Sequence, residues 1–127
     1  MAIRFRALPF FVYPVNDMNR ARAFYEGVLG LRPGANWEDI WQEYEIGDGP
    51  GVIALSTAME GCTPGARGGA AALEADDFDA AVAHLREHGV RFVLDPVDTG
   101  VCHFARFLDC DGNHMVLHRA HPEPTRA

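Results

Sequence analysis

A strand-and-helix pattern that occurs twice, about 60 residues apart, constrains the fold of this chain more than any other feature. In the first copy an apolar run at 10–15 leads to Asp17, a residue suited to capping a helix N-terminus. Apolar side chains then recur at three- and four-residue spacing, which predicts a helix over 18–29. Gly30 follows, where a left-handed C-cap is needed.

The second copy repeats each of these signals. An apolar run at 70–75 precedes an acidic N-cap at Asp76 or Asp77, and the helix that follows is closed by Gly89. Equivalent positions share one offset, as in the pairs Asp17 and Asp77, Met18 and Phe78, Ala21 and Ala81, and Tyr25 and Leu85. We therefore predict a duplicated strand-helix unit.

After each helix the apolar spacing changes to the alternation of a strand. The expected strands are 41–46 and 52–57 in the first half, and 90–94, 101–108 and 113–119 in the second. The chain is predicted to form a single α+β domain, 1–127, with a first module at about 1–58, a linker at 59–69 and a second module at about 70–120. The tail from His121 is expected to be loose. One helix covers one face of each sheet, which leaves the other face open to a ligand.

Composition limits the partners of such a domain. Apolar residues make up 48% of the 127 residues, enough for a sizeable core. The net charge of -7, without clusters of basic residues, argues against nucleic acid. The N-terminal residues are too polar for a signal peptide or membrane span, so we expect a cytoplasmic protein without a membrane partner. Three cysteines without CxxC spacing predict free thiols.

Two stretches carry a family resemblance. The first runs from Val15-Asn16-Asp17-Met18 through Ala23-Phe24-Tyr25-Glu26 to Leu29-Gly30-Leu31, and the second is the turn Asp109-Cys110-Asp111-Gly112-Asn113-His114. This chain resembles the vicinal oxygen chelate superfamily, which includes glyoxalase I, extradiol dioxygenases, and fosfomycin- and bleomycin-resistance proteins. The resemblance implies two βαβββ modules with curved mixed sheets, and a homodimer whose concave sheets enclose the site.

The same resemblance implies four metal-ligand positions, usually histidine or glutamate in metal-dependent members. Here they correspond to Phe10, Ala54, Ala70 and Val116. None of these side chains can coordinate a metal. We therefore expect neither a metal nor another cofactor at the usual place.

Histidines flank one of these positions. Because strand side chains alternate, Val116 shares its face with His114 and His118. These two histidines are about 13 Å apart at strand spacing, too far to clamp one ion unaided. They are interpreted as polar lining residues, while a rebuilt site that includes His103 and Glu43 stays open as an alternative.

The segment at 37–46 mixes aromatic and acidic side chains. Alternation directs Trp41 and Glu43 to the open face, where an indole and a carboxylate suit a flat or cationic organic molecule. The alternative is that Glu43 is solvated on an edge and Trp41 fills the core or a dimer interface. Arg106 could bind a carboxylate or pair with Asp109. The sequence does not decide on which face of its strand Arg106 lies, because a one-residue bulge would invert the alternation.

Three hypotheses follow. The first is a metal-independent binding protein of the bleomycin-resistance type, not an enzyme, that sequesters a small aromatic or cationic compound in a dimer cavity. The second is a lyase, isomerase or dioxygenase-like enzyme with a relocated metal or a histidine general base. The third is a dimeric interaction module. The residues expected to line the ligand site are Phe10, Trp41, Glu43, Ala54, Ala70, His103, Arg106, His114, Val116 and His118.

Overall fold

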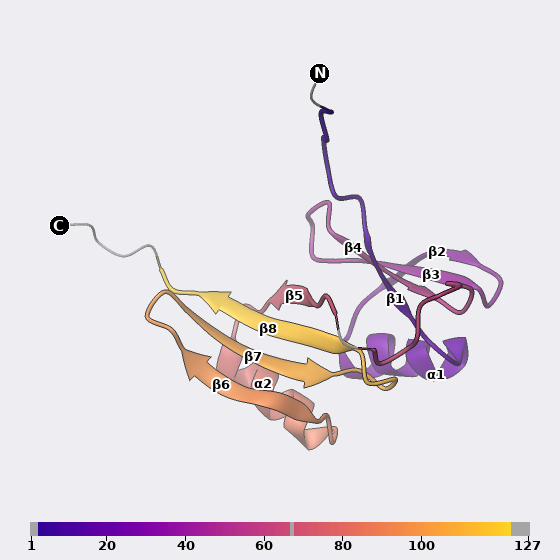
Figure 1. The fold of residues 1–127 in the computed structure, drawn as a ribbon. Coiled ribbons are helices and arrows are strands. Elements are labelled where there is room, and N and C mark those ends of the chain that lie inside the picture. The colour runs from indigo at the N-terminus through magenta and orange to yellow at the C-terminus, as the bar shows by residue number, and fades with distance from the viewer. Residues whose placement is uncertain (1–2, 67, 123–127) are drawn as a thin grey trace. The chain divides into compact units, whose positions relative to one another are not determined.

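The computed structural model describes residues 3–66 and 68–122 and divides into two compact units, with the boundary between Thr63 and Pro64. The first unit contains β1 (Phe11–Pro14), α1 (Met18–Arg22), the π-helix η1 (Ala23–Val28), β2 (Pro33–Trp37), β3 (Trp41–Glu45) and β4 (Val52–Ser56). The second contains β5 (Ala71–Glu74), α2 (Phe78–Glu87), β6 (Phe92–Asp98), β7 (Cys102–Leu108) and β8 (His114–Ala120). Figure 1 shows a four-stranded sheet and a helical segment in each.

The two sheets have the same topology. The strand orders are β1-β4-β3-β2 and β5-β8-β7-β6, and the first strand of each unit pairs in parallel with its last strand. The remaining pairs are antiparallel. The predicted α+β class, with two βαβββ-like modules, is therefore confirmed.

Aspartate caps begin both helices, as predicted. Asp17 accepts a hydrogen bond from Arg20 N at 3.0 Å, and Asp77, rather than Asp76, accepts one from Ala80 N at the same distance. Gly30 and Gly89 close the helical segments at φ +72° and +71°, in the left-handed region that favours glycine.

The first helical segment differs from the regular α-helix predicted over 18–29. It is α-helical only to Arg22 and continues as η1, in which Leu29 N donates to Phe24 O at 3.0 Å. Such a five-residue hydrogen bond widens the turn. The periodicity of apolar residues still places Ala21 and Tyr25 in the core, because a single wide turn shifts the stripe only slightly.

Strand β2 was not expected from the sequence. Its residues, Pro33 to Trp37, are all exposed, and Pro-Gly-Ala-Asn carries no alternation of apolar and polar side chains. It forms the edge of the first sheet, where proline and glycine are tolerated. Strand β6 also extends to Asp98, beyond the strand expected over 90–94, so its connection to β7 is shorter than the sequence indicated.

Each unit has a core on the helix side of its sheet. In the first unit Tyr25 stacks on Tyr44, with ring centroids 5.8 Å apart, above Ile53 and Leu55. In the second unit the buried apolar side chains come from α2, β7 and β8 and are Phe78, Val82, Leu85, Ala105, Phe107, Met115 and Leu117. The described residues contain no helix long and apolar enough to cross a membrane.

Candidate functional site

The open face of the first sheet carries Trp41 and Glu43. These side chains alternate along β3 with Gln42 and Tyr44, which are buried against the helix. In the register, Glu43 lies opposite Ala54, and Ala54 opposite Val12 on the other side. Trp41, Glu43 and Ala54 therefore lie on the sheet face opposite to the helix, as predicted.

An aromatic pair and a carboxylate are fixed together on this face. The rings of Phe10 and Trp41 meet edge to face, with centroids 5.4 Å apart and planes at 89°. The indole Nε1 of Trp41 donates to Glu43 Oε2 at 2.8 Å. Phe10 remains 40% exposed and Trp41 half-buried, so both rings have apolar surface that is open to solvent.

The open face of the second sheet follows from the pairing of β7 with β8. The register runs without a break from Cys102 opposite Ala120 to Leu108 opposite His114, and it sets Arg106 beside Val116. The irregular pairing lies between β6 and β7 instead. Since Ala105 and Phe107 are buried, Arg106 shares the other face with Val116, His114 and His118. This settles the facing of Arg106 that the sequence left open.

A cavity of about 690 Å³ lies in the second unit. Among the predicted site residues it is lined by Ala70, Arg106 and His114, and Val93 and Leu108 add apolar surface. Arg91 places a second guanidinium in its wall and was missed by the sequence analysis. Alternation along the strand could have identified Arg91, because Arg91 and Val93 lie on the face opposite to Phe92. The Phe92 ring is on the core side, 6.1 Å from the ring of buried Phe107.

His118 forms a dyad with a carboxylate that the sequence analysis also missed. Its Nδ1 is hydrogen-bonded to Glu74 Oε1, while Glu74 Oε2 accepts from Ala120 N at 2.8 Å. The hydrogen bond from His118, followed by that from the Ala120 backbone, lowers the pKa of Glu74 below its ordinary value. The ionised carboxylate therefore orients the imidazole and turns Nε2 away from Glu74.

His103 does not join His114 and His118. It alternates with Phe104 along β7 and so points to the same side as buried Ala105 and Phe107, opposite to Arg106. Its ring lies 5.6 Å from that of Phe78, at the start of α2. The predicted lining role of His103 is thus not supported by its position on the sheet.

The four positions that the resemblance assigns to metal ligands do not fit a metal. Phe10, Ala54, Ala70 and Val116 end in carbon atoms, whereas divalent metals need nitrogen, oxygen or sulfur donors. Ala54 is completely buried between Glu43 and Val12, so no larger donor replaces it there without repacking.

A family model described as the Glyoxalase/Bleomycin resistance protein/Dioxygenase superfamily matches residues 7–117. No curated protein sequence matches the chain.

Several solved structures are similar. TnmS3, an antibiotic binding protein from Streptomyces sp. CB03234, is 27% identical over 94% of this chain and 100% of its own, with a TM-score of 0.82. A glyoxalase/bleomycin resistance protein from the same organism is 29% identical over 87% and 97%, with a TM-score of 0.76. UcmS2 is 25% identical over 93% and 100%, with a TM-score of 0.74.

Proposed function

Because the chain belongs to the glyoxalase/bleomycin resistance protein/dioxygenase superfamily, we propose that it is a metal-independent protein that binds and sequesters a small aromatic compound. The observation on which this proposal rests is that the four positions assigned to metal ligands by the family resemblance have carbon side chains, while the sheet faces also have aromatic and basic groups. Sequestration requires an apolar cavity with a few polar contacts and no reacting group. Similarity to an antibiotic binding protein supports the same class of function.

The charges of the site favour one kind of aromatic ligand. Arg91 and Arg106 line the cavity of the second unit together with one carboxylate, Asp111, so basic groups outnumber acidic ones in its wall. A planar guanidinium pairs well with carboxylate, phenolate or carbonyl oxygens. In the first unit the Glu43 carboxylate is already engaged by the Trp41 indole, which leaves it less available to an organic cation. We therefore propose a flat aromatic compound with an acidic or carbonyl edge, rather than a cationic one.

The cavity is proposed to be completed in a homodimer. The N-terminal segment before β1 exposes apolar side chains, with Phe5 at 87% and Leu8 at 79% exposure. Large apolar side chains close together on a surface commonly mark a protein contact. The partner is proposed to be a second copy of this chain.

Isothermal titration calorimetry tests the binding function directly. Chelator-treated, untagged protein is titrated with a planar aromatic carboxylate and, in parallel, with a planar aromatic amine of the same ring system. We expect saturable binding of the carboxylate, and we expect Arg106→Gln to weaken that binding by about tenfold, the loss of one charge-assisted contact. Absence of binding by either compound, or binding only when a metal is restored, would overturn the proposal.

A second candidate function is supported by the Glu74–His118 dyad. A carboxylate that orients an imidazole is the usual arrangement of a general base, so His118 could remove a proton from a bound carbon acid. Proton NMR in deuterium oxide tests this without knowledge of the product. Exchange of a ligand C–H that is lost in both His118→Ala and Glu74→Gln would establish the enzyme, whereas binding without exchange leaves sequestration as the function.

A further inference from the structure

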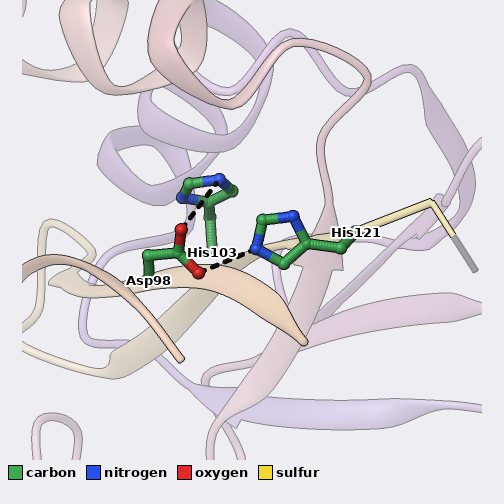
Figure 2. Close-up of side chains that lie close together, drawn as sticks. All are labelled: Asp98, His103 and His121. Atoms are coloured by element: carbon green, nitrogen blue, oxygen red, sulfur yellow. Dashed lines mark hydrogen bonds and ion pairs between the residues drawn. The ribbon is translucent and has the colours of Figure 1, made fainter. Parts of the chain in front are cut away.

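Three potential metal ligands meet in the second unit, away from the family's ligand positions. Figure 2 shows Asp98, at the end of β6, between the imidazoles of His103 from β7 and His121 just after β8. One donor atom from each residue lies within 4.8 Å of the other two. These side chains play no part in the proposed binding function.

The backbone holds all three residues in place. Asp98 and His103 are paired positions in the β6–β7 ladder. His121 N donates to Val101 O at 3.0 Å, which fixes the segment after β8 against the β6–β7 turn. Gly100 N donates to Asp98 Oδ1 at 2.9 Å, so the carboxylate is oriented as well. The site would therefore need little rearrangement to bind an ion.

The distances fit a small tetrahedral ion. Metal bonds of about 2.1 Å at tetrahedral angles separate neighbouring ligand atoms by about 3.4 Å. His121 Nε2 lies 2.7 Å from one Asp98 oxygen, Oδ1, and His103 Nε2 lies 3.9 Å from the other, Oδ2, so small side-chain rotations would bring one oxygen and both nitrogens to that spacing. The side chains are 29% exposed for His121, 40% for His103 and 53% for Asp98, which gives an ion access from solvent.

We propose that Asp98, His103 and His121 bind one Zn²⁺ or a similar divalent transition metal, with water completing the coordination. Two imidazoles and a carboxylate are ligands that zinc accepts readily, and both histidines coordinate in their neutral form. The ion would connect β6, β7 and the segment after β8, and so stabilise the second unit. Its ligands lie apart from the cavity, so ligand binding does not depend on it.

Calorimetric titration of chelator-treated, untagged protein with zinc chloride tests the site. We expect saturation at one equivalent per chain and a rise in melting temperature with zinc. His103→Gln and His121→Gln should each weaken zinc binding by at least about tenfold. Asp98→Asn should do the same while keeping an oxygen that accepts the Gly100 N–H, so that the turn is preserved.

A matched control is offered by the histidine pair on α2. His84 and His88 are one helical turn apart, with ring centroids 4.3 Å apart, and form an alternative place for a divalent ion. Zinc affinity unchanged in His84→Gln supports the proposed site. Loss of affinity in that variant with retention in His103→Gln and His121→Gln would overturn it, as would the absence of saturable zinc binding in the unaltered protein.

Discussion

At Gly65 two backbone segments approach each other so closely that there is no room for a side chain. It adopts φ +79°, and an added Cβ would lie 2.5 Å from the carbonyl oxygen of Asp111. Gly61 has the same φ, but an added Cβ there would meet nothing within 4 Å. A comparison of the two glycines therefore distinguishes the cost of a side chain at positive φ from the cost of a clash with the neighbouring backbone.

We predict that Gly61→Ala lowers the free energy of unfolding by about 1–2 kcal/mol, because alanine is strained at positive φ. Gly65→Ala should cost about 1–3 kcal/mol more, since a backbone atom must also move. Urea unfolding of both variants measures the difference. Equal losses would show that Gly65 and Asp111 are farther apart than the structure has them.

Tyr44 introduces a dependence of stability on alkaline pH. Its hydroxyl donates to Glu26 Oε2 at 2.9 Å, and burial, followed by this hydrogen bond, raises the pKa of Tyr44 far above its ordinary value of 10.0. The unfolded chain therefore loses this proton at lower pH than the folded chain. The stabilising contribution is complete below pH 10.0 and declines as pH rises above it.

We expect Tyr44→Phe to be less stable than the unaltered protein by about 1 kcal/mol at neutral pH, from the lost hydrogen bond. The difference should shrink in urea unfolding above pH 10.0. The chain contains no lysine, so no lysine amine titrates in the same alkaline pH range and obscures the effect of Tyr44. Glu26→Gln, which keeps an acceptor oxygen, is the control and should retain the alkaline decline. A constant difference between Tyr44→Phe and the unaltered protein would contradict the assignment.

Among the elements, the wide turn of η1 contains an exposed glycine at which no special conformation is required. An added Cβ at Gly27 meets nothing within 4 Å. We predict that Gly27→Ala raises the free energy of unfolding by about 0.5–1 kcal/mol, because alanine loses less backbone entropy on folding. Gly30→Ala, at φ +72°, should instead be destabilising. Thermal unfolding measures both stability changes. A gain for Gly27→Ala with a loss for Gly30→Ala would confirm where the helical segment ends, and changes of the same sign would contradict it.

The sequence predicts elements well where one side of the element is buried. Strands β3 and β8 alternate clearly, and each helix has an aspartate cap, so their type and facing could be inferred. Strand β2 could not, because all of its side chains are exposed and only its hydrogen bonds to β3 define it. The candidate site divides in the same way. Alternation predicted the facing of Trp41 and Glu43, but that of Arg106 needed the register of β7 with β8. The contributions of Arg91, Glu74 and Asp98 depend on which strands become neighbours.

At the scale of the whole molecule, self-association is the property to measure. We predict that the protein sediments as a dimer and that Phe5→Asp with Leu8→Asp shifts it to a monomer, because a charge at an apolar contact is costly to bury. Val101→Asp, at a side chain that is 68% exposed in the second unit, is the control and should leave the dimer intact. Analytical ultracentrifugation distinguishes these outcomes, and a monomeric unaltered protein would contradict the proposed dimer.

The alternation of buried and open side chains along β3, β7 and β8 has a consequence for how such a protein can diversify. On β8, Met115 and Leu117 support the core, whereas His114, Val116 and His118 lie on the face available to a ligand. Substitutions at the second set leave the core packing in place, so the chemistry of this face can change at little cost to folding. Because the topology occurs twice, the open face of each half can change separately while the core side of both sheets is retained.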